Sequence, residues 1–93
     1  MELLDYIPTG AENAIRTGAL LQASGLASER ALRKAIHRLR EEGHPICSST
    51  ERPAGYFLAA DKQEAARFIR SMESRRRAIG RAIQAAKRYL KEA

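Results

Sequence analysis

The sequence predicts a mainly α-helical (α+β) fold that contains a small β-hairpin and ends in a long C-terminal helix. Aliphatic residues recur at helical spacing over long stretches, and aromatic residues make up only 5% of the chain, so the core must consist mainly of Leu, Ile and Ala. Two short β-prone runs on either side of a turn-forming proline predict the hairpin. A chain of 93 residues has room for one domain with a modest core.

The sequence of the first quarter of the chain predicts two short helices separated by a turn. Residues 2–7 are expected to form a short helix, which the proline that follows them ends. Residues 13–15 are just long enough for a brief strand. Thr17 is predicted to cap a helix that runs to about Ala23. Gly25 supplies the break, because glycine readily adopts the left-handed conformation that ends a helix.

The stretch from residue 28 to residue 42 has a strongly sorted helical pattern. Ser28 is the expected N-cap, and Gly43 ends the helix. A core-facing stripe consists of Leu32, Ala35, Ile36 and Leu39. The opposite face carries Arg30, Lys34, His37 and Glu41, with Arg33 and Arg38 on its flanks. Between residues 28 and 40 there are five Lys or Arg against one acid, so cationic side chains are segregated on the outer face.

The second half of the chain predicts the hairpin and one long helix. The hairpin strands are expected at residues 45–49 and 55–60. Asp61 then begins the helix, with Glu64 at the position that completes a capping box. This helix is expected to run from about 62 to 91, a length of roughly 45 Å. That is longer than the preceding domain can cover.

A heptad-type apolar seam runs along the long helix. Its positions are Ala65, Ile69, Met72, Arg76, Ile79, Ile83, Ala86 and Leu90, and all but Arg76 are apolar. The start of the helix is predicted to pack on the domain through Ala65, Phe68, Ile69 and Met72. The later positions need other cover, and we expect a homodimer whose interface consists of Met72, Ile79, Ile83, Ala86 and Leu90.

Charge divides the chain into two parts. Residues 1–61 carry seven Lys or Arg against eight Asp or Glu, whereas residues 62–93 carry ten against three. The net charge of +6 and the pI near 10.1 indicate a polyanionic partner. We therefore expect a folded domain over residues 1–60 and a basic helix over residues 61–93 that acts as the dimerisation element.

The order helix, glycine turn, helix and β-hairpin is that of a winged helix-turn-helix. The stretch GLASERALRKAIHRLREEGHPICSS, followed by GYFL, resembles the winged-helix domains of the biotin-operon-repressor type over roughly residues 13–59. The small size and basic tail resemble, more loosely, short winged-helix proteins of phage and prophage genomes. These resemblances imply binding to double-stranded DNA, as a small transcriptional regulator or as a phage or prophage replication accessory factor.

The resemblance also implies which residues contact DNA. The base-facing residues at the start of the recognition helix are Ser28, Glu29, Arg30, Arg33 and Lys34. His37 and Arg38 are expected nearer the DNA backbone. Thr17 offers its backbone N–H to a phosphate. Arg52, in the hairpin loop, reaches a phosphate or the neighbouring minor groove.

Other interpretations of these features remain open. The charged face of residues 28–40 is also compatible with a merely solvated helix. Some winged helices bind only protein, so the alternative is an adaptor that recruits a partner through its C-terminal helix. The arginines at 75, 76, 77 and 81 either contact phosphates or keep a coiled coil in solution.

Enzyme, metal and membrane functions are not predicted. His44 and Cys47 provide only two of the four ligands that a structural zinc site needs. Neither a catalytic constellation nor a phosphate-binding loop is visible, so we expect no enzyme activity, no cofactor and no small-molecule ligand. A single cysteine fits a reducing cytoplasm. No apolar run approaches membrane-spanning length.

Overall fold

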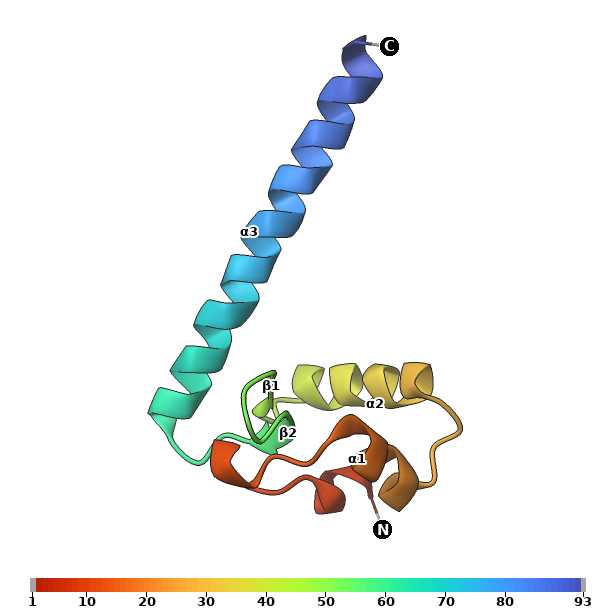
Figure 1. Ribbon diagram of the computed structural model, residues 1–93, viewed down its shortest axis with the longest axis vertical. Helices are drawn as coiled ribbons and strands as arrows, with labels where there is room; N and C mark the ends of the chain where they lie inside the picture. The colour runs from red at the N-terminus through yellow and green to blue at the C-terminus, as the bar shows by residue number, and fades with distance from the viewer. Residues whose placement is uncertain (1, 93) are drawn as a thin grey trace.

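The computed structural model describes residues 2–92 and shows a small unit of short helices and a hairpin from which one long helix projects (Figure 1). The elements in chain order are the 3₁₀ turns η1 (Leu3–Tyr6) and η2 (Ala11–Asn13), the helices α1 (Thr17–Ser24) and α2 (Glu29–Glu41), the strands β1 (Ile46–Ser49) and β2 (Gly55–Leu58), and the helix α3 (Lys62–Glu92). The prediction of a mainly helical fold with a two-stranded hairpin and a long C-terminal helix is confirmed.

The brief strand expected at residues 13–15 is reduced to a single residue. Asn13 belongs to η2, and Ile15 alone pairs, in an antiparallel bridge with Tyr56. Each backbone N–H of this pair donates to the carbonyl of the other, both at 2.9 Å. The bridge ties the segment before α1 to β2, so the hairpin and α1 are held in a fixed relation.

Gly55 makes this bridge possible. Its φ of +131° lies in a region that L side chains rarely adopt, and a Cβ there would overlap with the carbonyl group of Ile15. A larger residue would have to push the two backbones apart. The glycine is therefore a requirement of the crossing and not only of the turn.

The predicted end of α1 and the predicted N-cap of α2 are both found in the turn between these helices. Gly25 has a left-handed φ of +73° and ends α1, and Ser28 Oγ accepts a hydrogen bond from the backbone N–H of Ala31 at 3.1 Å. The N-cap predicted at Thr17 is wrong by one residue: Arg16 is the cap, and Thr17 is the first helical residue. Buried side chains from several elements form the core, namely Ile7, Leu20, Leu32, Ile36 and Ile46.

The start of α3 is capped by two acids, as predicted, but with a different set of partners. Asp61 Oδ1 accepts from the N–H of Glu64 at 2.9 Å. The Glu64 carboxylate accepts from the N–H of Ala60 at 2.9 Å, and not from that of Asp61 as a capping box requires. It also accepts from the N–H of Ala11 at 3.1 Å. Glu64 therefore ties α3 to η2.

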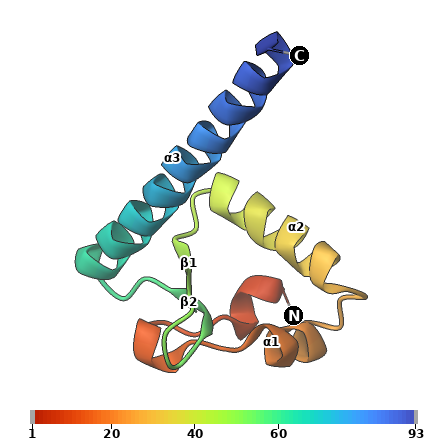
Figure 2. The same ribbon diagram turned by 45° about the horizontal axis from the view of Figure 1, so that its top comes forward.

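Only the beginning of α3 packs on the domain, and both views show the rest projecting away from it (Figures 1 and 2). Phe68 and Ala65 are half-buried, as expected. The packing predicted through Ile69 is wrong, because its side chain is 52% exposed, and Met72 is 37% exposed. The helix turns the side of Glu64 and Phe68 toward the domain, which rotates Ile69 outward at about 100° per residue.

Candidate nucleic-acid interface

The outer face of α2 carries an exposed cationic surface, which we call the α2 cationic face: Arg30, Arg33, Lys34, His37 and Arg38. Leu32 and Ile36, on the opposite side of the same helix, are fully buried. Burial of the apolar stripe therefore fixes the rotation of α2 and holds the cationic side chains toward solvent. Glu29, from the predicted base-facing set, lies beside them and is also exposed.

One ion pair and one histidine–carboxylate contact lie along the α2 cationic face. Arg33 Nη1 lies 3.6 Å from Glu29 Oε2, and His37 Nε2 lies 3.4 Å from Glu41 Oε1. The paired side chains are all at least 60% exposed (62% and 61% in the first pair, 73% and 69% in the second). Pairs this exposed contribute little to stability. An arriving phosphate can exchange with either carboxylate at small cost.

The hydroxyl group of Ser28 already caps α2. Its hydroxyl oxygen accepts the N–H of Ala31, as an N-cap does. The hydroxyl hydrogen stays free to donate to a base edge or a phosphate, since capping uses only the acceptor. The predicted contact of Ser28 is compatible with this geometry.

Thr17 and Arg52 lie together at a second surface. They line an open hollow of about 1100 Å³, which we call the α1–hairpin hollow, between the start of α1, the hairpin loop and α3. Arg16 and Arg75 line it as well, and hydroxyls come from Ser48, Ser49 and Thr50. None of its lining residues is acidic. The first N–H groups of α1 have no intrahelical carbonyl to bind, so this hollow combines guanidinium groups with free backbone donors.

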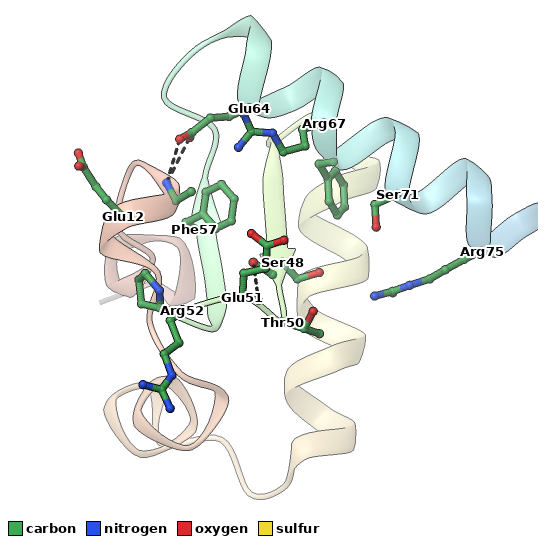
Figure 3. A pocket seen from close by; sticks show the side chains of 14 residues that line it. Glu12, Ser48, Thr50, Glu51, Arg52, Phe57, Glu64, Arg67, Ser71 and Arg75 are labelled. Atoms are coloured by element: carbon green, nitrogen blue, oxygen red, sulfur yellow. Dashed lines mark hydrogen bonds between the residues drawn. The ribbon is translucent and has the colours of Figure 1, made fainter.

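A neighbouring cavity of about 480 Å³ between the hairpin and α3 has mixed charge (Figure 3). Arg67, Ser71 and Arg75 reach it from α3, and Glu51 from the hairpin loop, whereas the guanidinium of Arg52, which also lines the cavity, points away from α3. Glu12 and Glu64 line it too, and the Glu64 carboxylate is occupied by backbone N–H groups. Because its acids offset its arginines, the electrostatics of this cavity favour an anion less than those of the α1–hairpin hollow do.

Arg40 is a structural residue that the sequence interpretation did not separate from the other cations of α2. Its Nε donates to the carbonyl of Ile46 at 2.8 Å, and its Cζ lies 4.9 Å from the centre of the Phe68 ring. Burial lowers the pKa of this guanidinium from its usual value, and Tyr56 and Cys47 partly offset the effect. Its spacing of eight residues from Leu32 and four from Ile36 was the available signal, since it continues their buried row.

The predicted dimer residues are all exposed in the single chain. Ile79, Ile83 and Leu90 are 60%, 48% and 74% exposed, and Ala86 is exposed with them. Large apolar side chains on a helix that nothing in residues 2–92 covers are typical of an interaction surface.

A metal-ligand cluster and a membrane-spanning helix each place specific requirements on the described part of the chain. Over residues 2–92 there is no group of three or more His, Cys, Asp or Glu side chains that could hold a metal ion. Cys47 is buried, and its Sγ contacts the carbonyl oxygen of Pro45 at 3.7 Å. No helix in this range combines the length and the apolar character needed to cross a membrane.

Comparison with known proteins identifies no relative of this chain. No protein-family model matches it, and no curated protein or solved structure is significantly similar to it. The proposals that follow therefore depend on the geometry and chemistry of the chain itself.

Proposed function

We propose that this chain is a winged helix-turn-helix protein that binds duplex DNA with α2 in the major groove. In this proposal α1 braces α2 across the DNA backbone, and the β1–β2 hairpin is the wing. An isolated β-bridge joins Ile15, just before α1, to Tyr56 in the wing. Its cellular role is that of a small transcriptional regulator or a phage-type replication accessory factor.

The observation that carries the proposal is the segregation of charge on α2. A helix that enters the major groove must present donors to phosphates and base edges along its outer face. Arg30, Arg33 and Lys34 are exposed in the first two turns of α2, while Leu32 is fully buried beneath them. Arginine and lysine at such positions bind guanine edges or phosphates.

The α1–hairpin hollow is a second observation that supports the proposal. A helix N-terminus beside arginine side chains favours a phosphate, because the N–H groups donate and the positive end of the helix dipole attracts the anion. Thr17, at the start of α1, and Arg52, on the wing, line this one hollow. Thr17 was expected at a phosphate, and Arg52 at a phosphate or in the neighbouring minor groove.

Charge-matched pairs of substitutions test the proposal. Arg33→Ala/Lys34→Ala removes two charges from the α2 cationic face, and Arg88→Ala/Lys91→Ala removes two exposed charges from the far end of α3. In fluorescence anisotropy with a mixed-sequence duplex, we expect the first pair to weaken binding about tenfold or more and the second less than about threefold. If both pairs of substitutions weaken binding equally, only net charge matters. If Arg33→Ala/Lys34→Ala causes no loss of affinity, α2 does not contact the duplex.

The exposed apolar side of α3 favours one alternative, a protein-binding adaptor that recruits a partner through this helix. In that case DNA contact is absent or incidental. The two substituted proteins would then show the same weak DNA binding as the unsubstituted chain. The DNA experiment therefore separates the two proposals.

A further inference from the structure

The uncovered seam of α3 requires a partner along most of its length. Most of α3 projects away from the domain (Figure 1), yet Met72, Ile79, Ile83 and Leu90 are 37–74% exposed and belong to a seam with the alternating four- and three-residue spacing of a coiled coil. From residue 69 to residue 90 the seam extends over about three heptads, the length at which a coiled-coil pattern becomes meaningful.

We propose that a second copy of the chain covers this seam by running antiparallel to it, with the two-fold axis passing between the two helices at the level of residue 81. In this register Ile79 packs against the partner's Ile83, and Met72 packs against the partner's Leu90. Each contact occurs twice because the interface is isologous. The inference concerns the assembly and does not depend on whether α2 binds DNA.

Arg76 decides between the two directions. In a parallel, in-register pair it would face the partner's Arg76 inside the seam, and two guanidinium groups would lose water beside a like charge. In the antiparallel register it lies opposite the partner's Ala86, a small residue past which a long side chain can reach solvent. The seam's one charged position is therefore tolerated only in the antiparallel arrangement.

The flanking residues also favour the antiparallel register. Glu73 and Lys87 border the same edge of the seam, and the antiparallel alignment places Glu73 opposite the partner's Lys87, so that two opposite-charge pairs form. In the parallel alignment Glu73 instead faces the partner's Phe68, and no flanking pair of opposite charge arises. Charge complementarity thus selects a second copy and its direction together.

The centre of the proposed interface is built for close approach. Gly80 and Ala82 flank the two-fold axis, and a Cβ at Gly80 would meet nothing within 4 Å beyond its chain neighbours and the adjacent backbone of α3. Small residues on both sides let the two backbones come near each other. On the far side of the helix four exposed arginines stay in solvent, namely Arg70, Arg77, Arg81 and Arg88.

This assembly separates the two folded domains. With the axis at the level of residue 81, the first residues of the two α3 helices, at Lys62, lie about 57 Å apart along the coil, at 1.5 Å per residue. A parallel pair would instead hold the domains side by side. If both domains bind the same duplex, the antiparallel form requires half-sites more than one helical turn apart, since a turn measures about 34 Å.

Crosslinking between single cysteines tests the direction. In a Cys47→Ala background, Met72→Cys and Leu90→Cys chains are prepared separately, mixed, and treated with a short bismaleimide. We expect covalent dimers between the two variants and almost none from Leu90→Cys alone, because two copies of residue 90 would be about 27 Å apart. Efficient self-crosslinking of Leu90→Cys would overturn the proposal in favour of a parallel pair.

A charge swap tests the register by a second measurement. Glu73→Lys or Lys87→Glu alone creates two like-charge pairs, and we expect each to weaken self-association about five- to tenfold in sedimentation equilibrium. The two changes combined in one chain should restore it. An additive loss in the combined variant would refute the antiparallel dimer. An unsubstituted chain that stays monomeric at every concentration would refute it too, and would mean that a different protein covers the seam.

Discussion

The guanidinium of Arg40 lies over the ring of Phe68, with Cζ 4.9 Å from the ring centre. Its Nε also donates to the carbonyl of Ile46. One side chain of α2 thus contacts both β1 and α3, and Figure 2 shows α2 and α3 converging near β1. This relationship sets the direction in which α3 leaves the domain, since few other contacts hold the long helix.

A double-mutant cycle measures the Arg40–Phe68 contact. Phe68→Leu keeps apolar cover but removes the ring, and Arg40→Met removes the cation. We expect a coupling free energy of about 0.5–1 kcal/mol, the usual value of a cation–π contact at a partly exposed site. Urea unfolding at one protein concentration supplies the four values. Purely additive losses would mean that the ring only covers apolar surface.

Gly55 should be far more sensitive to substitution by alanine than Gly18 is. Gly55→Ala places a methyl group on the carbonyl of Ile15, and we expect a loss of at least about 2 kcal/mol in the free energy of unfolding. Gly18→Ala, in α1 with open space around it, is the control and should gain up to about 1 kcal/mol. Equal small effects would contradict the close crossing of the two backbones.

The N-terminus of α1 allows a substitution that removes one donor and little else. Thr17 is the first helical residue, where proline fits, and Arg16 before it has the extended backbone (φ −64°, ψ 148°) that proline prefers. Thr17→Pro should therefore leave the melting temperature nearly unchanged but weaken duplex DNA binding about three- to tenfold. Thr17→Ser, which keeps the N–H, is the matched control. Unchanged affinity for Thr17→Pro would exclude this N–H from the interface.

Cys47 should make the stability of the chain fall at alkaline pH. Burial raises the pKa of its thiol, and Arg40 partly opposes the rise. The unfolded chain releases the thiol proton near its usual pKa of about 8.5, while the folded chain still holds it, so the free energy of unfolding falls as pH increases above that value. Thermal melts between about pH 7 and 10 should show a steeper decline for the natural chain than for Cys47→Ala. Parallel declines would contradict the raised pKa.

Local signals in the sequence predicted much of the fold. The cap at Ser28, the break at Gly25 and the apolar stripe of α2 lie within a few residues of each other along the chain, and each has a short-range physical cause. The acids at Asp61 and Glu64 likewise marked the start of α3. These elements could be predicted because capping and helical periodicity act over one or two turns.

Long-range contacts account for what the sequence did not predict. Arg40 looked like one more cation of α2, and only the fold brings Phe68 and Ile46 to it. Ile69 was expected inside because it lies on the seam, but the domain packs on a different side of α3. The partnership of Glu64 with Ala11 joins residues 53 positions apart, which no local pattern reports.

The salt dependence of duplex DNA binding tests the role of α2 most directly. For the unsubstituted chain we expect the logarithm of the binding constant to fall linearly with the logarithm of salt concentration, with a slope of about −0.9 for each phosphate contacted. Arg33→Ala/Lys34→Ala should reduce the magnitude of that slope by up to about two, according to how many of the two side chains contact phosphate. If this pair changes neither the slope nor the affinity, α2 does not contact the duplex.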